Sequence, residues 1–345
     1  MRVTTPQARF GAVVAAGAAA LTLAVSGCGS SSNATPHRSS ASASPAALPA
    51  GGLDQWFGRH VVAVTHNGGE QQFPQDTLFA LHSAEKLHMQ VLDVDIQMSK
   101  DDIPVLIHSE TADSSTNGQG DVSQLTAAQL SQLDAAYWWV PDCGTSCKGR
   151  PASAYVDRGI RTGAKPLPPG ATSRAEFGVP TLEEVFQQFP NAFLDIELKP
   201  ESDSAIKVAA LIHQYHREDR TIVASFDDKQ IAQFHALAPT VPISPGQTAS
   251  TNFFLGKPMP PGFQVLQLPY RYEFGGKMVT VITPDLISRA HAAGLAVWVW
   301  DEGATPGKAL YQTLVNLGVD GILASRPSDL LDVLHADHAE WSPGS

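Results

Sequence analysis

Residues 61–108 set the pattern of the chain, and they read VVAVTHNGGEQQFPQDTLFALHSAEKLHMQVLDVDIQMSKDDIPVLIH. The apolar run Val61–Thr65 predicts a strand, residues Asp76–Leu87 predict a helix, and Val91–Ile96 predict a second strand. Strands that are apolar almost throughout are typical of a parallel sheet whose two faces are both buried. This stretch therefore predicts a parallel β-α-β unit.

The same alternation continues toward the C-terminus. Further strands are predicted at Val105–Ile107, Phe193–Leu198, Thr221–Ser225, Val265–Leu268, Leu295–Trp300 and Gly321–Ala324, and further helices at Thr181–Phe189, Ser202–Tyr215, Lys229–Ala238, Pro284–Ala293, Lys308–Leu317 and Ser328–His335. Repeated βα units predict an α/β fold, either a TIM (β/α)8 barrel or a doubly wound sheet. Polar residues fall at the carboxyl ends of several strands, which favours the barrel because barrel enzymes build their sites there.

Composition divides the chain into segments. Residues 53–335 are predicted to form the barrel, and residues 109–177 are predicted to be an insertion because they are rich in Gly, Pro and Ser. Residues 336–345 form a tail. Residues 29–52 are mainly Ser, Ala and Pro, which cannot bury a core, so they are predicted to be a flexible tether.

Residues 1–28 are predicted to be a secretory signal peptide. Arg2 and Arg9 precede an alanine-rich apolar run from Gly11 to Val25, which leads into Val25-Ser26-Gly27-Cys28. That ending resembles a bacterial lipobox, which implies lipidation of Cys28 and anchoring to the outer face of the cell membrane. An ordinary secreted protein is the alternative.

The charge of the chain limits its partners. The formal net charge is −11, and removal of Arg2 and Arg9 would leave 21 of the 23 basic side chains against 34 acidic ones, a charge of −13. No basic patch is visible, so a nucleic-acid partner is not expected. An acidic surface does not favour anionic membranes either, so membrane contact is expected through the lipid alone.

Two cysteines lie close together within the insertion. Cys143 and Cys147 occur in the turn-rich segment Pro-Asp-Cys-Gly-Thr-Ser-Cys-Lys-Gly. Outside the cytoplasm this spacing predicts a short disulfide. A metal site would need further Cys or His residues nearby in the sequence, and none are present.

Two histidines flank an acidic strand. His66 and His108 each follow an apolar run, and Asp93 and Asp95 occupy alternate positions on the strand between them. Alternate strand residues point to one side, so the two carboxylates can share a hard cation. A divalent cation and two proton-transfer groups are the components that phosphodiester cleavage requires.

A second charged strand contributes further candidates. Asp195, Glu197 and Lys199 alternate in Phe-Leu-Asp-Ile-Glu-Leu-Lys-Pro. Glu197 is predicted to be a third ligand of Mg²⁺ or Ca²⁺, and Lys199 is predicted to contact a phosphate oxygen. A solvated strand is the alternative interpretation. No G-x-G-x-x-G, Walker A or H-E-x-x-H motif is present, so dinucleotide, P-loop and zinc-protease functions have no support.

The order of these motifs resembles the glycerophosphodiester phosphodiesterase family. The matching segments are His66-Asn-Gly-Gly, Pro74-Gln-Asp-Thr77, Asp93-Val-Asp95-Ile, Pro104-Val-Leu-Ile-His108, Thr116-Asn-Gly118, Ile196-Glu-Leu-Lys199, Ser225-Phe226, Trp298, Gly318-Val-Asp-Gly-Ile322 and Arg326-Pro327. The resemblance implies a TIM barrel that hydrolyses glycerophosphodiesters to glycerol 3-phosphate and an alcohol.

The resemblance also implies roles for individual residues. The metal ligands would be Asp93, Asp95 and Glu197, and the general acid and base would be His66 and His108, with their assignment left open. Phosphate and substrate contacts would come from Lys199, Asn67 and Trp298.

The chain departs from the family pattern at six positions. Asn67 and Ser114 replace arginines, Gln75 and Asp93 replace glutamates, Asp76 replaces an asparagine, and Ser109 replaces an aspartate. Arginine binds phosphate through two charge-assisted hydrogen bonds that Asn and Ser cannot form. The activity is therefore expected to be weakened or redirected. The alternatives are a surface-tethered binding protein and a phospholipase similar to sphingomyelinase D.

Overall fold

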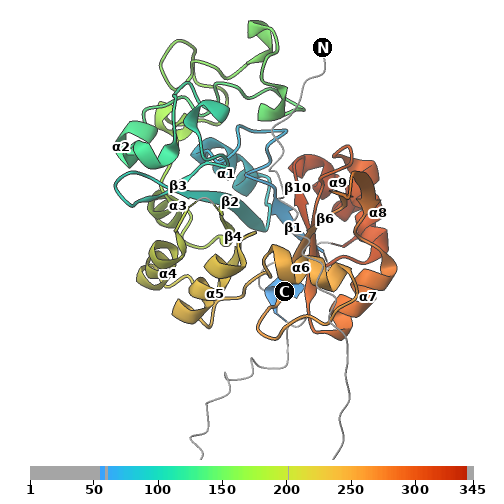
Figure 1. Ribbon diagram of the computed structural model, residues 1–345. Coiled ribbons are helices and arrows are strands. Elements are labelled where there is room, and N and C mark those ends of the chain that lie inside the picture. Colours follow the sequence, from blue (N-terminus) through green and yellow to red (C-terminus); the bar gives the residue numbers. More distant parts are fainter. Residues whose placement is uncertain (1–54, 59–60, 201, 340–345) are drawn as a thin grey trace, which may run out of the picture. The chain divides into compact units, whose positions relative to one another are not determined.

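The structure is a computed structural model that describes residues 55–58, 61–200 and 202–339 (Figure 1). The predicted signal peptide, the lipidation site at Cys28, the tether at 29–52 and residues 340–345 of the tail lie outside the described residues. Nothing in the structure therefore bears on these predictions.

Parallel strands form a nearly closed barrel. Along the sheet they run in the order β5-β4-β2-β1-β10-β9-β6, and they comprise β1 (Val62–Thr65), β2 (Val91–Met98), β4 (Phe193–Leu198), β5 (Thr221–Ala224), β6 (Val265–Pro269), β9 (Ala296–Trp300) and β10 (Gly321–Ala324). Ile243 lies in the gap between β5 and β6, where it forms a parallel bridge with Val223 and its carbonyl accepts from Gln264 N at 3.1 Å. The strands follow chain order around the ring, so the predicted TIM barrel is confirmed and the doubly wound alternative is wrong.

The strand before His108 does not belong to the ring. β3 (Pro104–Leu106) pairs antiparallel with β2, with Ile96 opposite Leu106. Its connection to β2 runs only from Ser99 to Ile103, whereas a parallel crossover needs about a dozen residues or more. β3 therefore folds back along the upper end of β2 and returns the chain to the level of Asp95.

The helices lie on the outside of the strands (Figure 1). They are α1 (Leu78–Lys86), α3 (Leu182–Gln188), α4 (Ala205–Gln214), α5 (Asp228–Leu237), α6 (Gln247–Phe254), α7 (Pro284–Ala292), α8 (Lys308–Leu317) and α9 (Pro327–Asp337), of which α6 was not expected from the sequence. Local signals set their starts: Thr181 and Glu184 form a capping box before α3, and Thr283 caps α7, whose first residue is Pro284. Their apolar faces pack on the outward side chains of the strands in one large core.

The lower part of the barrel interior is apolar. Inward side chains of six strands pack with Phe57, from the short helix η2 (Trp56–Gly58). They are Val62, Val64, Val91, Ile222, Val265, Ala296, Trp298 and Leu323. Trp298 has no exposed surface, and its Nε1 donates to the Phe57 carbonyl at 2.8 Å. It forms the floor of the barrel, which corrects the substrate contact expected for it.

Residues 109–177 contain only short helical segments. These are η3 (Ala112–Ser114), η4 (Val122–Gln124), α2 (Ala127–Leu130), η5 (Thr145–Cys147), η6 (Ala152–Ala154) and η7 (Arg174–Phe177). They enclose two small apolar clusters, one around Leu130 and one around Phe177.

A further hairpin, β7 (Arg271–Phe274) with β8 (Lys277–Thr280), was also not expected. Within the described ranges, no helix is both long and apolar enough to cross a bilayer.

Candidate active site

The predicted site residues meet at the carboxyl end of the barrel. His66 follows β1, and Asp93 and Asp95 lie in β2. Glu197 lies near the end of β4, two residues before Lys199. Asp95 and Glu197 are partners in the β2–β4 register, so their inward side chains stand side by side. The parallel strands thus bring together side chains that lie more than 100 residues apart.

Lys199 joins two of the predicted carboxylates. Its Nζ lies 2.9 Å from Asp95 Oδ1 and 2.9 Å from Glu197 Oε1, and its side chain is 7% exposed. Burial alone would lower the pKa of Lys199, but the two carboxylates hold it above its usual range. Burial would raise the pKa of Asp95, and the Lys199 ammonium instead keeps it below its usual range. The lysine is therefore a fixed positive charge at the centre of the mouth.

A second layer of carboxylates, Asp93 and Asp195, lies two residues deeper along β2 and β4. Asp93 Oδ2 accepts from Asn67 N at 2.8 Å, and both oxygens of Asp195 accept from Gln267 Nε2 at 3.0 and 2.9 Å. Burial raises the pKa of Asp93 well above its usual range and raises the pKa of Asp195 to about 7. The carboxylate of Asp93 thus lies deeper in the barrel than that of Asp95 and is hydrogen-bonded to the backbone of Asn67. The family has the longer Glu at this position.

The negative charge of the carboxylates fits a hard cation, although the three predicted ligands are not arranged around one point. Among the side chains that the structure describes, no group of three His, Cys, Asp or Glu residues is arranged to hold a metal ion. The site nevertheless holds several buried carboxylates and a buried ammonium, that of Lys199. Asp76, which was not predicted, is one of these carboxylates, and its Oδ1 accepts from Asp95 N at 3.2 Å. Asp76 Oδ2 and Asp95 Oδ2 are buried and have no hydrogen-bond partner. Such excess negative charge is costly unless a cation or protons neutralise it.

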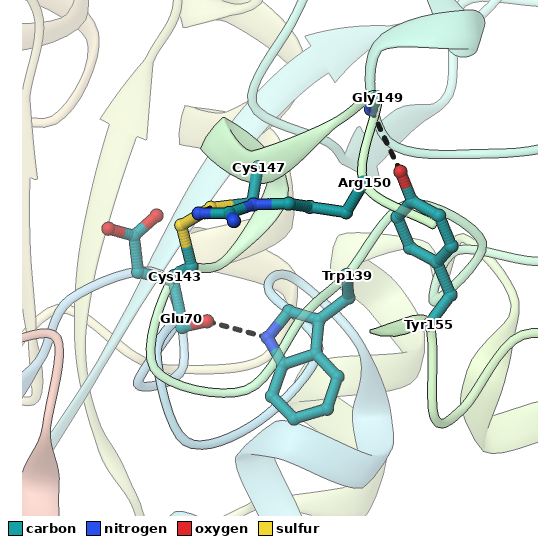
Figure 2. Close-up of a disulfide and its surroundings, with 7 residues drawn as sticks. All are labelled: Glu70, Trp139, Cys143, Cys147, Gly149, Arg150 and Tyr155. Atoms are coloured by element: carbon teal, nitrogen blue, oxygen red, sulfur yellow. Dashed lines mark hydrogen bonds between the residues drawn. A yellow bond between two sulfur atoms is a disulfide. The ribbon is translucent and has the colours of Figure 1, made fainter. Parts of the chain in front are cut away.

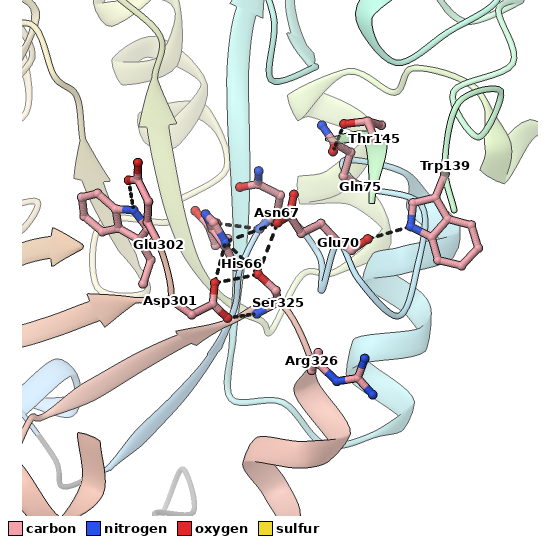
Figure 3. A network of polar contacts seen from close by, with 12 residues as sticks. His66, Asn67, Glu70, Gln75, Trp139, Thr145, Asp301, Glu302, Ser325 and Arg326 are labelled. Atoms are coloured by element: carbon pink, nitrogen blue, oxygen red, sulfur yellow. Dashed lines mark hydrogen bonds and ion pairs between the residues drawn. The ribbon is translucent and has the colours of Figure 1, made fainter. Parts of the chain in front are cut away.

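His66 lies in an acidic environment (Figure 3). Its Nδ1 is 3.2 Å from Ser325 Oγ, 3.7 Å from Asp301 Oδ1 and 4.0 Å from Glu70 Oε1, and the side chain is 23% exposed. Burial opposes the charged form, but the Asp301 and Glu70 carboxylates outweigh it and raise the pKa of His66 to about 10. His66 therefore carries a proton at neutral pH.

His108 lies in the opposite electrostatic environment. β3 brings it to the mouth, where the preceding Ile107 N donates to the Asp95 carbonyl at 3.1 Å. Repulsion by the Lys199 ammonium, together with the partial loss of water around the imidazole, lowers the pKa of His108 to about 4. The side chain is solvent-exposed at the mouth, so water weakens this repulsion. The imidazole is therefore neutral at physiological pH, with a nitrogen free to accept a proton.

The insertion covers one side of the mouth. Cys143 and Cys147 form a disulfide with a Cα–Cα distance of 5.9 Å, and Trp139 Nε1 nearby donates to the Glu70 carbonyl at 2.6 Å (Figure 2). Thr145, within the disulfide loop, donates to Gln75 Oε1 at 3.0 Å. The loop thus packs directly against the segment that follows His66.

The structure describes both positions where the family has an arginine, Asn67 and Ser114. Asn67 is 4% exposed, and Ser114 pairs with Thr111 at 2.8 Å between hydroxyl oxygens. Arg326 lies near this loop, but it pairs with Asp142 and Asp329. Lys199 is a buried cation of the site, and its charge acts on His108.

Four acidic or polar residues of the site were not predicted from the sequence. They are Glu70, Asp76, Asp301 and Ser325. Asp301 and Ser325 directly follow predicted strands, so the rule that located His66 at a strand end would have found both. Glu70 and Asp76 lie in the loop between β1 and α1, and neither directly follows a predicted strand, although Asp76 belongs to the matching segment Pro74–Thr77.

Comparison with known proteins identifies the family. Residues 66–329 match the model of the glycerophosphoryl diester phosphodiesterase family. A glycerophosphodiester phosphodiesterase of Caldanaerobacter subterraneus subsp. tengcongensis is 24% identical over 280 residues, covering 79% of this chain and 97% of that protein.

Solved structures share the fold. A putative glycerophosphoryl diester phosphodiesterase from Silicibacter pomeroyi superposes with a TM-score of 0.62 at 21% identity, over 82% of this chain and 96% of that one. An Oleispira antarctica phosphodiesterase in complex with the product sn-glycerol-3-phosphate has a TM-score of 0.57 at 21% identity, over 80% of this chain and 97% of that one. The family predicted from the motifs is confirmed: the chain belongs to the glycerophosphoryl diester phosphodiesterase family and is a phosphoric diester hydrolase.

Proposed function

We propose that the chain hydrolyses glycerophosphodiesters to glycerol 3-phosphate and an alcohol. One observation carries this proposal: His66 and His108 stand at one barrel mouth in opposite electrostatic environments. A protonated and a neutral imidazole form the acid and base pair that cleavage of a phosphodiester requires. The Oleispira antarctica protein, which binds the product sn-glycerol-3-phosphate, supports the same substrate class.

The charges assign a role to each histidine. His108 accepts the proton of the attacking oxygen, because the Lys199 ammonium favours its neutral form. His66 donates its proton to the leaving alkoxide, because Asp301 and Glu70 favour its charged form. The P–O bond to the attacking oxygen forms as the bond to the leaving oxygen breaks, and each histidine returns to its starting state by exchanging one proton with water.

Asp95 and Glu197 are the residues that would hold the divalent cation, with Asp93 and Asp76 close by. The buried oxygens Asp76 Oδ2 and Asp95 Oδ2, which have no hydrogen-bond partner, support a hard ion such as Mg²⁺ or Ca²⁺. When bound, such an ion would neutralise the charge of the phosphate oxygens. Lys199 supplies part of the same positive charge from the protein itself.

Turnover of purified chain lacking residues 1–28 tests the proposal. Glycerophosphocholine and glycerophosphoglycerol are assayed with Mg²⁺, with Ca²⁺ and with chelator. His66→Gln and His108→Gln should each lower kcat by about 10²–10⁴-fold, the contribution typical of a proton-transfer group. His291→Gln is the matched control, since His291 pairs with Asp320 at 2.8 Å at the opposite end of the barrel. Unchanged turnover in the first two variants would overturn the assignment.

The missing arginines make a tethered binding protein the second candidate. Asn67 and Ser114 both lack the bidentate phosphate contact that an arginine provides. Titration calorimetry separates the two functions: the enzyme should bind millimolar Mg²⁺ or Ca²⁺, while glycerophosphodiester binding without turnover would favour the binding protein. Headgroup release from liposomes tests the sphingomyelinase-D-like alternative.

We also propose that Cys28 is lipidated and anchors the chain to the outer face of the cell membrane. The support comes from the N-terminal sequence alone, in which basic residues are followed by an apolar run that leads to this cysteine. Membrane fractionation of the parent and of Cys28→Ala tests it. The variant should move to the soluble fraction, and equal membrane association would reject the anchor.

A further inference from the structure

Three segments that are distant in the sequence converge on one nitrogen of His66 (Figure 3). His66, Asp301 and Ser325 each follow one of the neighbouring strands β1, β9 and β10. Their positions at one rim put Ser325 Oγ 3.2 Å from His66 Nδ1, and Ser325 Oγ donates to Asp301 Oδ1 at 2.8 Å. The serine therefore bridges the carboxylate and the imidazole.

This arrangement is not that of a serine nucleophile. A nucleophilic serine and its orienting acid contact opposite nitrogens of the histidine. Here Ser325 and Asp301 both approach Nδ1, and Ser325 is fully buried. Nδ1 must act as a donor toward these oxygens, so the proton that can be transferred is carried by Nε2.

Asp301 is itself held firmly in place. Its Oδ2 accepts from Ser325 N at 2.9 Å and from Tyr311 Oη at 2.9 Å, and Tyr311 Oη in turn accepts from Arg326 N at 3.1 Å. The carboxyl is 4% exposed. Burial would raise the pKa of Asp301, but the hydrogen bonds and His66 keep it below its usual range. A fixed, ionised carboxylate therefore faces the imidazole.

We propose that Asp301, acting through Ser325, is a positioning residue that holds Nδ1 of His66 inward as a proton donor and directs Nε2 toward the substrate. The proposal rests on the proposed function, in which His66 is the general acid. Asp301 touches no reacting atom, so it acts only through the histidine. The other titratable groups that face His66 are Glu70, Asp93, Asp95, Asp195, Glu197 and His108.

Asp301→Asn is the direct test, because it keeps the size of the side chain and removes its charge. The new amide group would also donate toward Nδ1, which favours the wrong tautomer of His66. We expect kcat/KM to fall about 100-fold, near the lower end of a proton-transfer contribution. The basic limb of the pH profile of kcat/KM should move to lower pH by about one unit or more, since an opposite charge this close shifts a pKa by that much. Asp301→Glu should restore part of both.

Asp320→Asn is the matched control. Asp320 is also a buried carboxylate, 6% exposed, and pairs with a histidine, but it precedes β10 at the end of the barrel away from the mouth. This variant should leave the pH profile unchanged. The proposal is overturned if the Asp301→Asn profile coincides with that of the parent, or if both variants shift it equally.

Nitrogen-15 NMR of the histidine rings separates this proposal from the proposed function. In the parent, Nδ1 of neutral His66 should be protonated. In Asp301→Asn the pKa of His66 should fall by about one unit or more. This readout needs no substrate. A parent without diesterase activity would reject the proposed function, while an unchanged His66 tautomer and titration in Asp301→Asn would reject the role of Asp301.

Discussion

Replacing Lys199 with methionine should destabilise the barrel strongly. The ammonium lies 2.9 Å from an oxygen of Asp95 and of Glu197, and Asp95 is only 1% exposed. Methionine fills similar space but leaves the buried carboxylate of Asp95 and the half-buried carboxylate of Glu197 without a counter-charge. Breaking a buried pair by removing one partner costs about 3–5 kcal/mol. For a domain of this size, that corresponds to a loss of about 6–20 °C in Tm.

The loss should depend on pH and on cations. Without the ammonium, the pKa values of Asp95 and Glu197 rise, so protonation at low pH supplies the missing neutralisation. The cost of Lys199→Met should therefore be largest near pH 8 and smaller near pH 5. Added Mg²⁺ or Ca²⁺ should stabilise the variant more than the parent, because an ion can then bind between the two carboxylates and neutralise them.

Denaturant unfolding at pH 5 and pH 8, with and without cation, measures these effects. Lys308→Met is the matched control: Lys308 Nζ lies 2.6 Å from Asp332 Oδ2, but both side chains are more than half exposed. Exposed pairs contribute little, so this variant should show almost no loss. Equal losses in the two variants, or a Lys199→Met loss that does not change with pH, would refute the reasoning.

Three further predictions concern the floor, the disulfide and the pH dependence of stability. Trp298→Phe should lower the free energy of unfolding by about 1–3 kcal/mol, the cost of an unmet buried hydrogen bond, and leave KM unchanged; a raised KM at full stability would restore its role as a substrate contact. Reducing the Cys143–Cys147 bond, whose sequence separation is 4, should cost no more than about 2 kcal/mol because the closed loop is short; a larger loss by calorimetry would contradict this. The raised pKa of His66, about 10 against 6.5, contributes stability that is complete below pH 6.5 and is lost as pH rises toward 10; Asp301→Asn should flatten that decline in unfolding experiments, and an equal decline would argue against the pairing.

The order of elements and the location of the mouth were predictable because their signals are local. Apolar runs and helical periodicity depend on neighbouring residues, and they identified the strands of the ring and most of the helices. The direction of β3 was missed, although the short connection from Ser99 to Ile103 already excluded a parallel crossover. Trp298 was expected to contact the substrate only through the family resemblance, whereas its inward position belongs to the floor.

By itself, the sequence determined which chemical groups this protein has and at which strand ends most of them lie, including His66, His108, Asp95, Glu197 and Lys199. Only the tertiary structure decided their charge states. Ser325 lies 259 positions from His66 in the chain, yet the closed barrel puts the two in contact. Protonation depends on burial and on charges a few ångströms away through space, and these distances exist only once the strands have closed into a ring.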